Sequence, residues 1–414
     1  MVSLRRQGRA RSQPRLAPGA SERRLVIVAT VLLVLYGIVM SYSASTAQGF
    51  FDKGSSVFFL ERQSIYAVIG LFTMAALSRV DYVLWRRVAF PIGAGVLFVL
   101  MLVLIPGVGA QLNGARRWII IAGQSITPSE FAKIAAVMVV ASLVVRHPAD
   151  VKTARGFARL AAIGILPAAA LIMLEPDLGS TLVLVTGVVA VLIVAGVRLR
   201  HLFLAAFAGA FTVLALIAIE PYRWQRLVTF FDPWRDPGGD GYQPIQALVS
   251  IASGRIFGVG LGNSVQKFGY LPEQGTDMIT GIIGEELGLI GLAVLIGLYV
   301  FLGWACFRIA LTCREPFGKL LAVGITSIVA GQACINIGAA VGLLPVTGVP
   351  LPLVSCGGTS LVVVLAGIGI VLNIATNRRS HIVVSTERQN RASGRGRDRR
   401  APDAGARGSR RGHR

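Results

Sequence analysis

The chain alternates long apolar runs with short polar segments. Most runs approach the roughly 20 apolar residues that cross the hydrocarbon core of a bilayer. Because backbone groups in lipid must be satisfied within the segment, helices are the expected spanning structure. The pattern therefore predicts an all-α polytopic membrane protein with ten transmembrane helices, at about 25–43, 63–79, 88–106, 129–146, 156–173, 179–197, 201–219, 278–307, 318–343 and 354–376.

Composition agrees with a membrane protein. Of 414 residues, 54% are hydrophobic and only 15% are charged, which is too apolar for a soluble chain of this length. The four cysteines lie in or beside apolar runs without CxxC spacing. They are expected to behave as small hydrophobic residues, so neither a disulfide framework nor a cysteine metal site is predicted.

Positive charge is concentrated at the two ends of the chain. The net charge is +21, of which residues 1–24, with seven Arg and one Glu, carry +6. Residues 377–414, with twelve Arg and three acidic residues, carry +9. Both ends are predicted to be disordered basic tails flanking a membrane domain at 25–376. Such tails are attracted to anionic membrane lipids, and no nucleic acid partner is expected because no aromatic platform accompanies the arginines.

The loop charges predict the orientation. Connections that follow odd-numbered spans carry four Lys or Arg residues in their short loops, and connections that follow even-numbered spans carry twelve. Positive charge marks the cytoplasmic side, so both termini are predicted to be cytoplasmic. A long extracytoplasmic loop, residues 220–277, then lies between helices 7 and 8. The connections that contain Arg116, Asp177, Asp277 and Pro350 all fall on the outer side.

The stretch from Lys267 to Gly288 places five charged residues within about twenty residues on this outer face, in a chain with few acidic residues. It contains Glu273, Asp277, Glu285 and Glu286 immediately before or within the start of an apolar span. Ionisable groups at a membrane helix end are costly unless they pair or act, which favours a functional site. The alternative is a helix cap that simply ends in water.

Three other outer segments carry candidate binding residues. Arg116 and Arg117 could bind phosphate oxygens through forked hydrogen bonds, or could contact only lipid headgroups. Glu130 and Lys133 are spaced i, i+3 and could pair on one helix face. Asp177 lies in a tight Pro-Gly turn, where capping the next helix is the favoured interpretation.

Several motifs together resemble the SEDS family of membrane glycosyltransferases (shape, elongation, division and sporulation proteins). They are distributed over residues 25–376 and read N-G-A-R-R-W at 113–118, P-S-E-x-x-K at 128–133, P-D-L-G at 176–179, G-N-S-x-Q-K-x-x-Y-L-P-E at 262–273, T-D at 276–277, I-I-G-E-E-L-G at 282–288 and G-L-L-P-V-T-G-x-P-L-P at 342–352. The G-N-S-x-Q-K form and the Arg-rich N-terminal segment are more similar to the division branch than to the elongation branch. Three positions depart from the family pattern, in which His, Phe and Tyr are usual at the places of Gly275, Met278 and Cys356.

The resemblance implies polymerisation of lipid II into glycan strands at the outer face of the bacterial cytoplasmic membrane, at the division septum. Asp277 is then the essential carboxylate, acting as a base or holding a divalent cation, Mg or Mn. The implied substrate-binding residues are Arg116, Arg117, Lys267, Glu130, Lys133, Asp177, Glu285 and Glu286. A class B penicillin-binding transpeptidase and other division proteins are the implied partners.

Two other functions fit a ten-helix membrane protein. A lipid II flippase would move the substrate without bond chemistry, but it needs polar groups through the whole membrane depth. The charged motif residues gather at one face instead, which favours the enzyme. A silent scaffold for division proteins is disfavoured because Asp277 is retained. An elongation-type polymerase stays an alternative within the family.

Overall fold

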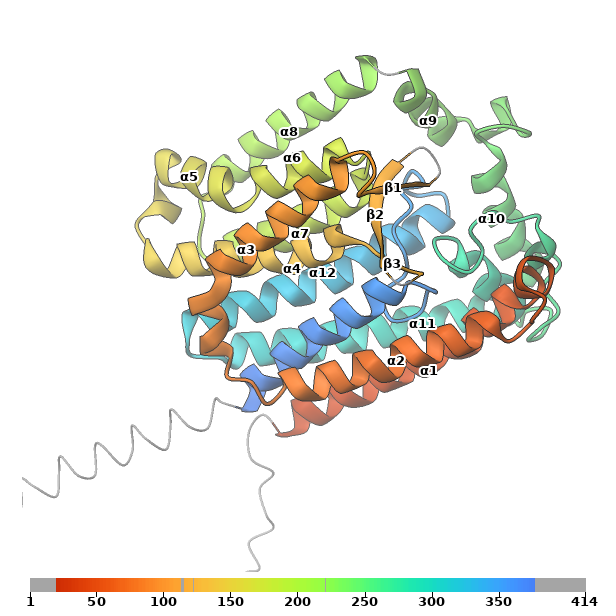
Figure 1. Ribbon diagram of the computed structural model, residues 1–414, viewed down its shortest axis with the longest axis horizontal. Coiled ribbons are helices and arrows are strands. Elements are labelled where there is room, and N and C mark those ends of the chain that lie inside the picture. The colour runs from red at the N-terminus through yellow and green to blue at the C-terminus, as the bar shows by residue number, and fades with distance from the viewer. Residues whose placement is uncertain (1–19, 113–114, 122, 220, 377–414) are drawn as a thin grey trace, which may run out of the picture.

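The structure is a computed structural model that describes residues 20–376 except 113–114, 122 and 220. Helix lies in every one of the ten predicted apolar spans (Figure 1). The helices are α1 (Ala20–Lys53), α2 (Phe58–Leu77), α3 (Tyr82–Leu104), α4 (Pro128–Arg146), α5 (Ala154–Gly164), α6 (Leu166–Leu174), α7 (Leu178–Val194), α8 (Leu199–Ile219), α9 (Pro221–Phe231), α10 (Tyr242–Gly254), α11 (Ile279–Thr312), α12 (Pro316–Ala340) and a C-terminal helix, Gly358–Thr376. The first helix thus begins before the predicted domain boundary at residue 25. The rest of the two predicted tails lies outside the described residues.

The chain is a multi-pass membrane protein. Six of the described helices are long and apolar enough to cross a membrane, and they lie in α1, α3, α4, α11, α12 and the C-terminal helix. A seventh span is made if α5 and α6 count together; they are bent by 43° where Pro167, which has no N–H, interrupts the predicted span 156–173. Ten crossings therefore stay a prediction.

A small antiparallel sheet corrects the expectation of a purely helical protein. Strands β1 (Ala110–Leu112), β2 (Ala115–Ile121) and β3 (Gln124–Ile126) pair in the order β1-β2-β3. The three isoleucines that end β2 are β-branched and favour a strand. Ile121 pairs with Gln124, and Gly123, with φ of +78°, lies in the intervening tight turn. The hairpin holds Arg116 and Arg117 on a rigid strand instead of on a loop.

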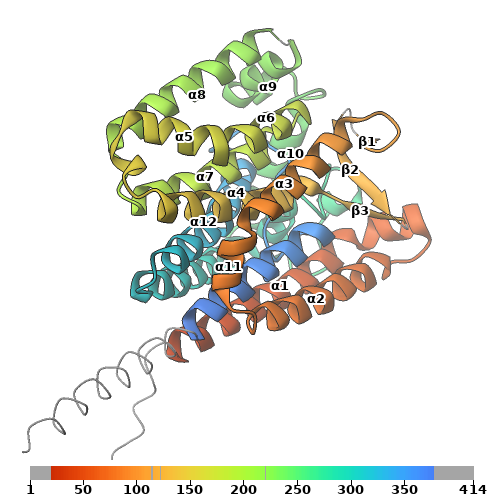
Figure 2. The same ribbon diagram turned by 60° about the vertical axis from the view of Figure 1, so that its left-hand side comes forward.

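The polar connections gather at opposite ends of the helix bundle. At one end, Asn373 accepts a hydrogen bond from the Tyr82 N–H (2.9 Å) and donates to the Ser78 carbonyl (3.0 Å), so the α2–α3 turn meets the end of the C-terminal helix. The described chain begins and ends at this same end (Figures 1 and 2). The sheet and the connections with Asp177 and Asp277 lie at the other end. Both described termini therefore fall on one side, as the loop charges predict.

Helix α11 is broken at Gly288, whose φ of +65° and ψ of −163° belong to a region that favours glycine. The irregular segment 255–260 passes this break and supplies the missing backbone partners. Four hydrogen bonds replace helical ones: Val259 N–H to Glu285 O (3.0 Å), Gly260 N–H to Glu286 O (3.0 Å), Leu289 N–H to Arg255 O (2.9 Å) and Ile290 N–H to Ile256 O (3.2 Å). This segment belongs to the apolar, Gly-rich stretch 247–262, which is too short to cross a membrane.

Serines of α1 hold that helix against the second half of the chain. The Ser41 hydroxyl donates to the Val354 carbonyl (2.9 Å), and the Ser43 hydroxyl donates to the Glu286 carboxylate (2.7 Å). Gly37 lies so close to the backbone of Val354 that a Cβ there would clash. Helix α1 therefore packs beside α11 through polar as well as apolar contacts.

Candidate active site

A cavity of about 920 Å³ opens among the predicted outer connections. The structure brings together there all four segments that loop charge placed on one side. The cavity is lined by residues of β2, the α6–α7 turn, the segment before α11, the loop 345–350 and the start of the C-terminal helix. Of the predicted site residues, Arg117, Glu130, Asp177 and Asp277 line it.

Asp277 lies immediately before α11, on the cavity wall. The pKa of Asp277 is raised to about 7, chiefly by burial; the charges of Glu273 and Asp177 also raise it, and the charge of Arg117 lowers it. A carboxylate with such a pKa is a suitable general base near neutral pH, because it is both partly ionised and able to hold a proton. Gly348 faces it so closely that a Cβ there would lie 3.3 Å from Asp277 Oδ2.

Asn336 of α12 fixes the backbone of Asp277. Its side-chain N–H groups donate to the carbonyls of Asp277 and Val349 (2.7 Å each), and its carbonyl accepts from the Thr280 hydroxyl (2.8 Å). The side chain is 2% exposed, so these bonds form in a dry interior. Sequence analysis missed this residue, because an Asn within an apolar helix gives no sign of its tertiary partner.

Arg117 lies between carboxylates. Its Nη1 is 3.9 Å from Asp177 Oδ2, and its guanidinium lies 4.5 Å from the centre of the Trp118 ring. The Asp177 side chain also accepts from the Ser180 N–H (2.9 Å), which confirms the predicted cap of the following helix. Arg116 points elsewhere: it is not part of the cavity lining, and its Nε donates to Gln111 Oε1 (3.4 Å).

Next to this pair lies an unpaired acid, Glu175. It is fully buried, and neither carboxylate oxygen has a hydrogen-bond partner among the described residues. Burial raises its pKa to about 8, the charge of Asp177 raises it, and that of Arg117 lowers it. Glu175 is therefore mostly neutral at pH 7 and leaves Arg117 to the other two carboxylates.

Glu130 and Lys133 form the predicted i, i+3 pair on α4. Lys133 Nζ donates to Glu130 Oε1 (2.7 Å) and to Gln332 Oε1 (2.9 Å) of α12. Gln332 in turn donates to the Pro350 carbonyl (2.9 Å). Glu130 lines the cavity, whereas Lys133 is 1% exposed behind it. Lys133 therefore supports the wall and does not reach into the cavity.

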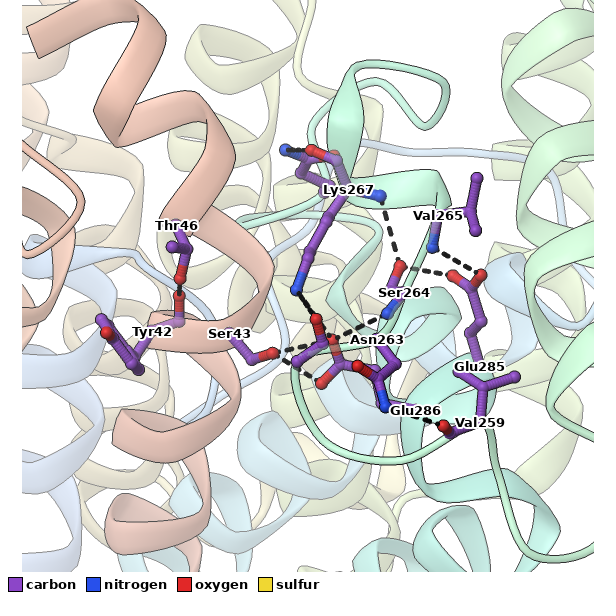
Figure 3. A network of polar contacts seen from close by, with 12 residues as sticks. Tyr42, Ser43, Thr46, Val259, Asn263, Ser264, Val265, Lys267, Glu285 and Glu286 are labelled. Carbon is purple, nitrogen blue, oxygen red and sulfur yellow. Dashed lines mark hydrogen bonds and ion pairs between the residues drawn. The ribbon is translucent and has the colours of Figure 1, made fainter. Parts of the chain in front are cut away.

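Lys267, Glu285 and Glu286 form a separate buried network (Figure 3). Lys267 Nζ lies 3.5 Å from Glu286 Oε1, and Glu286 also accepts from Ser43 of α1. Glu285 accepts from the Ser264 hydroxyl (2.5 Å) and the Val265 N–H (3.0 Å). None of the three predicted residues lines the cavity, so Lys267 lies apart from the place where a substrate would be held.

The two small residues that depart from the family pattern meet on the cavity wall. The Cys356 N–H donates to the Gly275 carbonyl (2.9 Å), and the Cys356 thiol lies 3.9 Å from the Ser45 hydroxyl. A Cβ at Gly275 would lie 2.5 Å from the same hydroxyl. Met278, the third departure, is 1% exposed and packs in the core.

The described side chains around Asp277 do not by themselves form a metal centre. Among the residues that the structure describes, no group of three or more His, Cys, Asp or Glu side chains is placed to hold a metal ion. The positive charge of Arg117 acts on Asp277 and would compete with a cation bound there. A divalent ion at this place would need further oxygen ligands from the substrate.

These features define a multi-pass membrane protein with a carboxylate-bearing cavity at one end of its helix bundle. Residues 23–380 match the model of the FtsW/RodA/SpoVE family, described as cell cycle protein. The chain belongs to this family, which is the SEDS family that its motifs resemble.

Known relatives cover nearly the whole membrane domain. Stage V sporulation protein E of Bacillus subtilis (strain 168) is 41% identical over 86% of this chain and 97% of its own length. A probable peptidoglycan glycosyltransferase FtsW of Geobacter sp. (strain M18) is 35% identical over the same shares.

Two solved structures share the fold. A chain from a structure described as structural coordination of polymerization and crosslinking by a peptidoglycan synthase complex has a TM-score of 0.70 and 31% identity, covering 86% of this chain and 97% of that one. The rod shape determining protein RodA of Thermus thermophilus has a TM-score of 0.63 and 29% identity, covering 86% and 96%.

Proposed function

We propose that the chain is a peptidoglycan glycosyltransferase that polymerises lipid II at the outer face of the cytoplasmic membrane during cell division. The observation that carries this proposal is the half-buried carboxylate of Asp277, with a pKa of about 7, in the wall of a cavity that also holds Arg117. Relatives named as probable peptidoglycan glycosyltransferases support it.

The proposed reaction joins two lipid-linked disaccharides. The 4-hydroxyl oxygen of the acceptor sugar bonds to the anomeric carbon of the donor, and the bond from that carbon to the donor diphosphate breaks. The electron pair leaves with the lipid diphosphate. Asp277 takes the hydroxyl proton as the new bond forms and later releases it to water. Arg117 offsets the negative charge that develops on the leaving diphosphate.

A divalent cation is an additional element of the proposal. It would be held by Asp277 and the substrate's own diphosphate oxygens, and it would supply further positive charge to the leaving group. No step above depends on it.

The proposed partner is a class B penicillin-binding transpeptidase acting at the septum. Its support is the likeness to a chain from a peptidoglycan synthase complex whose description couples polymerization to crosslinking. Other division proteins, and membrane lipids around the bundle, complete the expected surroundings.

The testing experiment uses purified wild-type protein and Asp277→Asn, each with its cognate transpeptidase, labelled lipid II and a divalent cation. Glycan ladders are expected from the wild type and none from the variant, because an amide cannot accept the hydroxyl proton. The matched control is Asp240→Asn, an exposed acid outside the cavity, which should retain wild-type turnover. Normal turnover by Asp277→Asn would reject the assignment, and lipid II movement across vesicles without ladders would favour a flippase.

A further inference from the structure

One cationic side chain of the cavity has no place in the reaction as described. Arg62 of α2 lines the cavity and is half-buried, yet within the described part of the chain it makes no ion pair. Arg117, in contrast, is engaged by Asp177 and acts on Asp277. A cation in a cavity wall without an acidic partner attracts an anion from outside the protein.

Arg62, a residue of α2, faces the start of the C-terminal helix across the Tyr66 ring. Its guanidinium is 5.9 Å from the centre of the Tyr66 ring, and that ring packs so tightly on Gly358 that a Cβ there would clash. The neighbouring Gln63 donates to the Ser355 carbonyl (3.2 Å).

The start of the C-terminal helix lines the same part of the cavity through Gly357, Gly358, Thr359 and Ser360. The first backbone N–H groups of a helix have no partner within the helix, and the helix dipole makes this end positive. Glycine allows a ligand to approach these groups closely. The helix end and the unpaired guanidinium thus offer the donors and the charge that phosphate oxygens require.

Tyr66 closes this part of the wall. Its hydroxyl donates to Gln124 Oε1 of β3 (2.6 Å), and the Thr359 hydroxyl donates to the Ser125 carbonyl (3.2 Å). The sheet, α2 and the C-terminal helix are therefore tied together around Arg62. A ligand bound there would meet a built wall and not a mobile side chain.

We propose that Arg62 and the start of the C-terminal helix form a second diphosphate subsite, which holds the acceptor lipid while Arg117 serves the donor. This inference rests on the proposed function, because only a polymerising transferase needs two lipid diphosphates at once. The donor diphosphate leaves from the reacting carbon and must lie near Asp277, where Arg117 is. The acceptor diphosphate lies a disaccharide away from the attacking hydroxyl, which requires a second cationic place.

The test compares wild type, Arg62→Ala and Arg62→Lys in vesicles of zwitterionic lipid. The control is Arg159→Ala, an exposed arginine of α5 outside the cavity. Polymerisation gives KM and kcat for lipid II. A lipid II analogue with a bulky cap on its 4-hydroxyl can react only as donor. The cap would occupy the place of the donor carbon if the analogue lay in the acceptor position, so the inhibition constant of this analogue reports the donor site.

For Arg62→Ala we expect the KM for lipid II to rise roughly tenfold or more, as for loss of a charge-assisted contact, with kcat nearly unchanged. The inhibition constant of the capped analogue should stay at the wild-type value. Arg62→Lys should recover part of the KM, because it keeps the charge without the fork.

Three kinetic results would overturn the proposal. An inhibition constant that rises together with KM would assign Arg62 to the donor. An unchanged KM would remove Arg62 from lipid binding, and an effect seen only in vesicles with phosphatidylglycerol would assign it to phospholipid headgroups.

Direct binding of fluorescent lipid II separates a failure of the proposed transferase function from a failure of the acceptor subsite. If wild type binds but makes no glycan, the transferase and its acceptor subsite both fail, whereas glycan synthesis with equal binding by Arg62→Ala rejects the subsite alone.

Discussion

Single residues set the chemistry of the cavity, and Asp277 is the clearest case. Its raised pKa means that the protonated form dominates below about pH 7. If Asp277 is the base, kcat/KM should rise with pH through about 7, because this ratio reports the pKa of the free enzyme, and one unit below this value it should be about tenfold under its plateau. The neighbouring charges then tune the profile in opposite directions.

Glu273→Gln removes a charge that raises the pKa of Asp277, so the pH profile of kcat/KM should shift to lower pH. Arg117→Gln removes the charge that lowers it, so the profile should shift to higher pH, together with a lower plateau. The measurement is kcat/KM against pH for the wild type and the two variants. Parallel shifts of both variants, or no shift in either, would mean that the titration does not belong to Asp277.

Asn336 acts on Asp277 through the backbone. Asn336→Ala removes both donated bonds, and a small displacement of the carboxylate should lower kcat by roughly 10- to 100-fold with little change in KM. Thr280→Val is the matched variant, since it removes only the third bond of the same hub and should cost less. Both are measured with lipid II; an equal loss in the two variants would contradict a specific hold on Asp277.

The sequence predicted some residues of the site and not others, for physical reasons. Asp277, Asp177 and Arg117 stand in polar connections, where a charge is conspicuous. Arg62 and Asn336 lie within helices, and only the fold shows what they face. Lys267 was expected near the diphosphate, but Glu286 lies within 3.5 Å and keeps it in the buried network.

At the scale of elements, the break in α11 depends on one glycine. A Cβ at Gly288 would clash with the backbone of Gly258 and Ile256, and the local φ and ψ are strained for other residues. Gly288→Ala should therefore lower the free energy of unfolding by about 1–3 kcal/mol, because of this strain, and the thermal unfolding temperature should fall with it. Gly297→Ala in the same helix has nothing within 4 Å of its new Cβ and is the control. Equal melting of the two variants would show that the break tolerates a side chain.

Helical elements were predictable because a long apolar run that crosses a membrane satisfies its own backbone hydrogen bonds by forming a helix. The hairpin at 110–126 was not, since Arg-Arg-Trp between apolar spans is equally typical of a loop, and only strand pairing distinguishes them. The break at Gly288 also escapes prediction. Its replacement hydrogen bonds come from residues 255–260, which the sequence does not connect with this point.

At the scale of the whole molecule, the orientation stays a prediction that accessibility can test. In a background without the four native cysteines, Asp240→Cys should react with a membrane-impermeant maleimide added to intact spheroplasts. Lys152→Cys should react only after permeabilisation, because its loop is predicted to be cytoplasmic. The reverse pattern would invert the topology and place the cavity inside the cell.

The hydrogen bonds that Ser41 and Ser43 of α1 donate also determine how late in synthesis the folded structure can be completed. Ser43 finds Glu286 across 243 residues of chain, and Ser41 finds Val354 across 313. The first helix enters the bilayer long before either partner has been translated. Until then, the hydroxyls of Ser41 and Ser43 lack their final hydrogen-bond acceptors. Contacts of such separation form late. A ribosome that stalls before α11 would leave α1 inserted yet unanchored, a state that membrane proteases can distinguish from the finished protein.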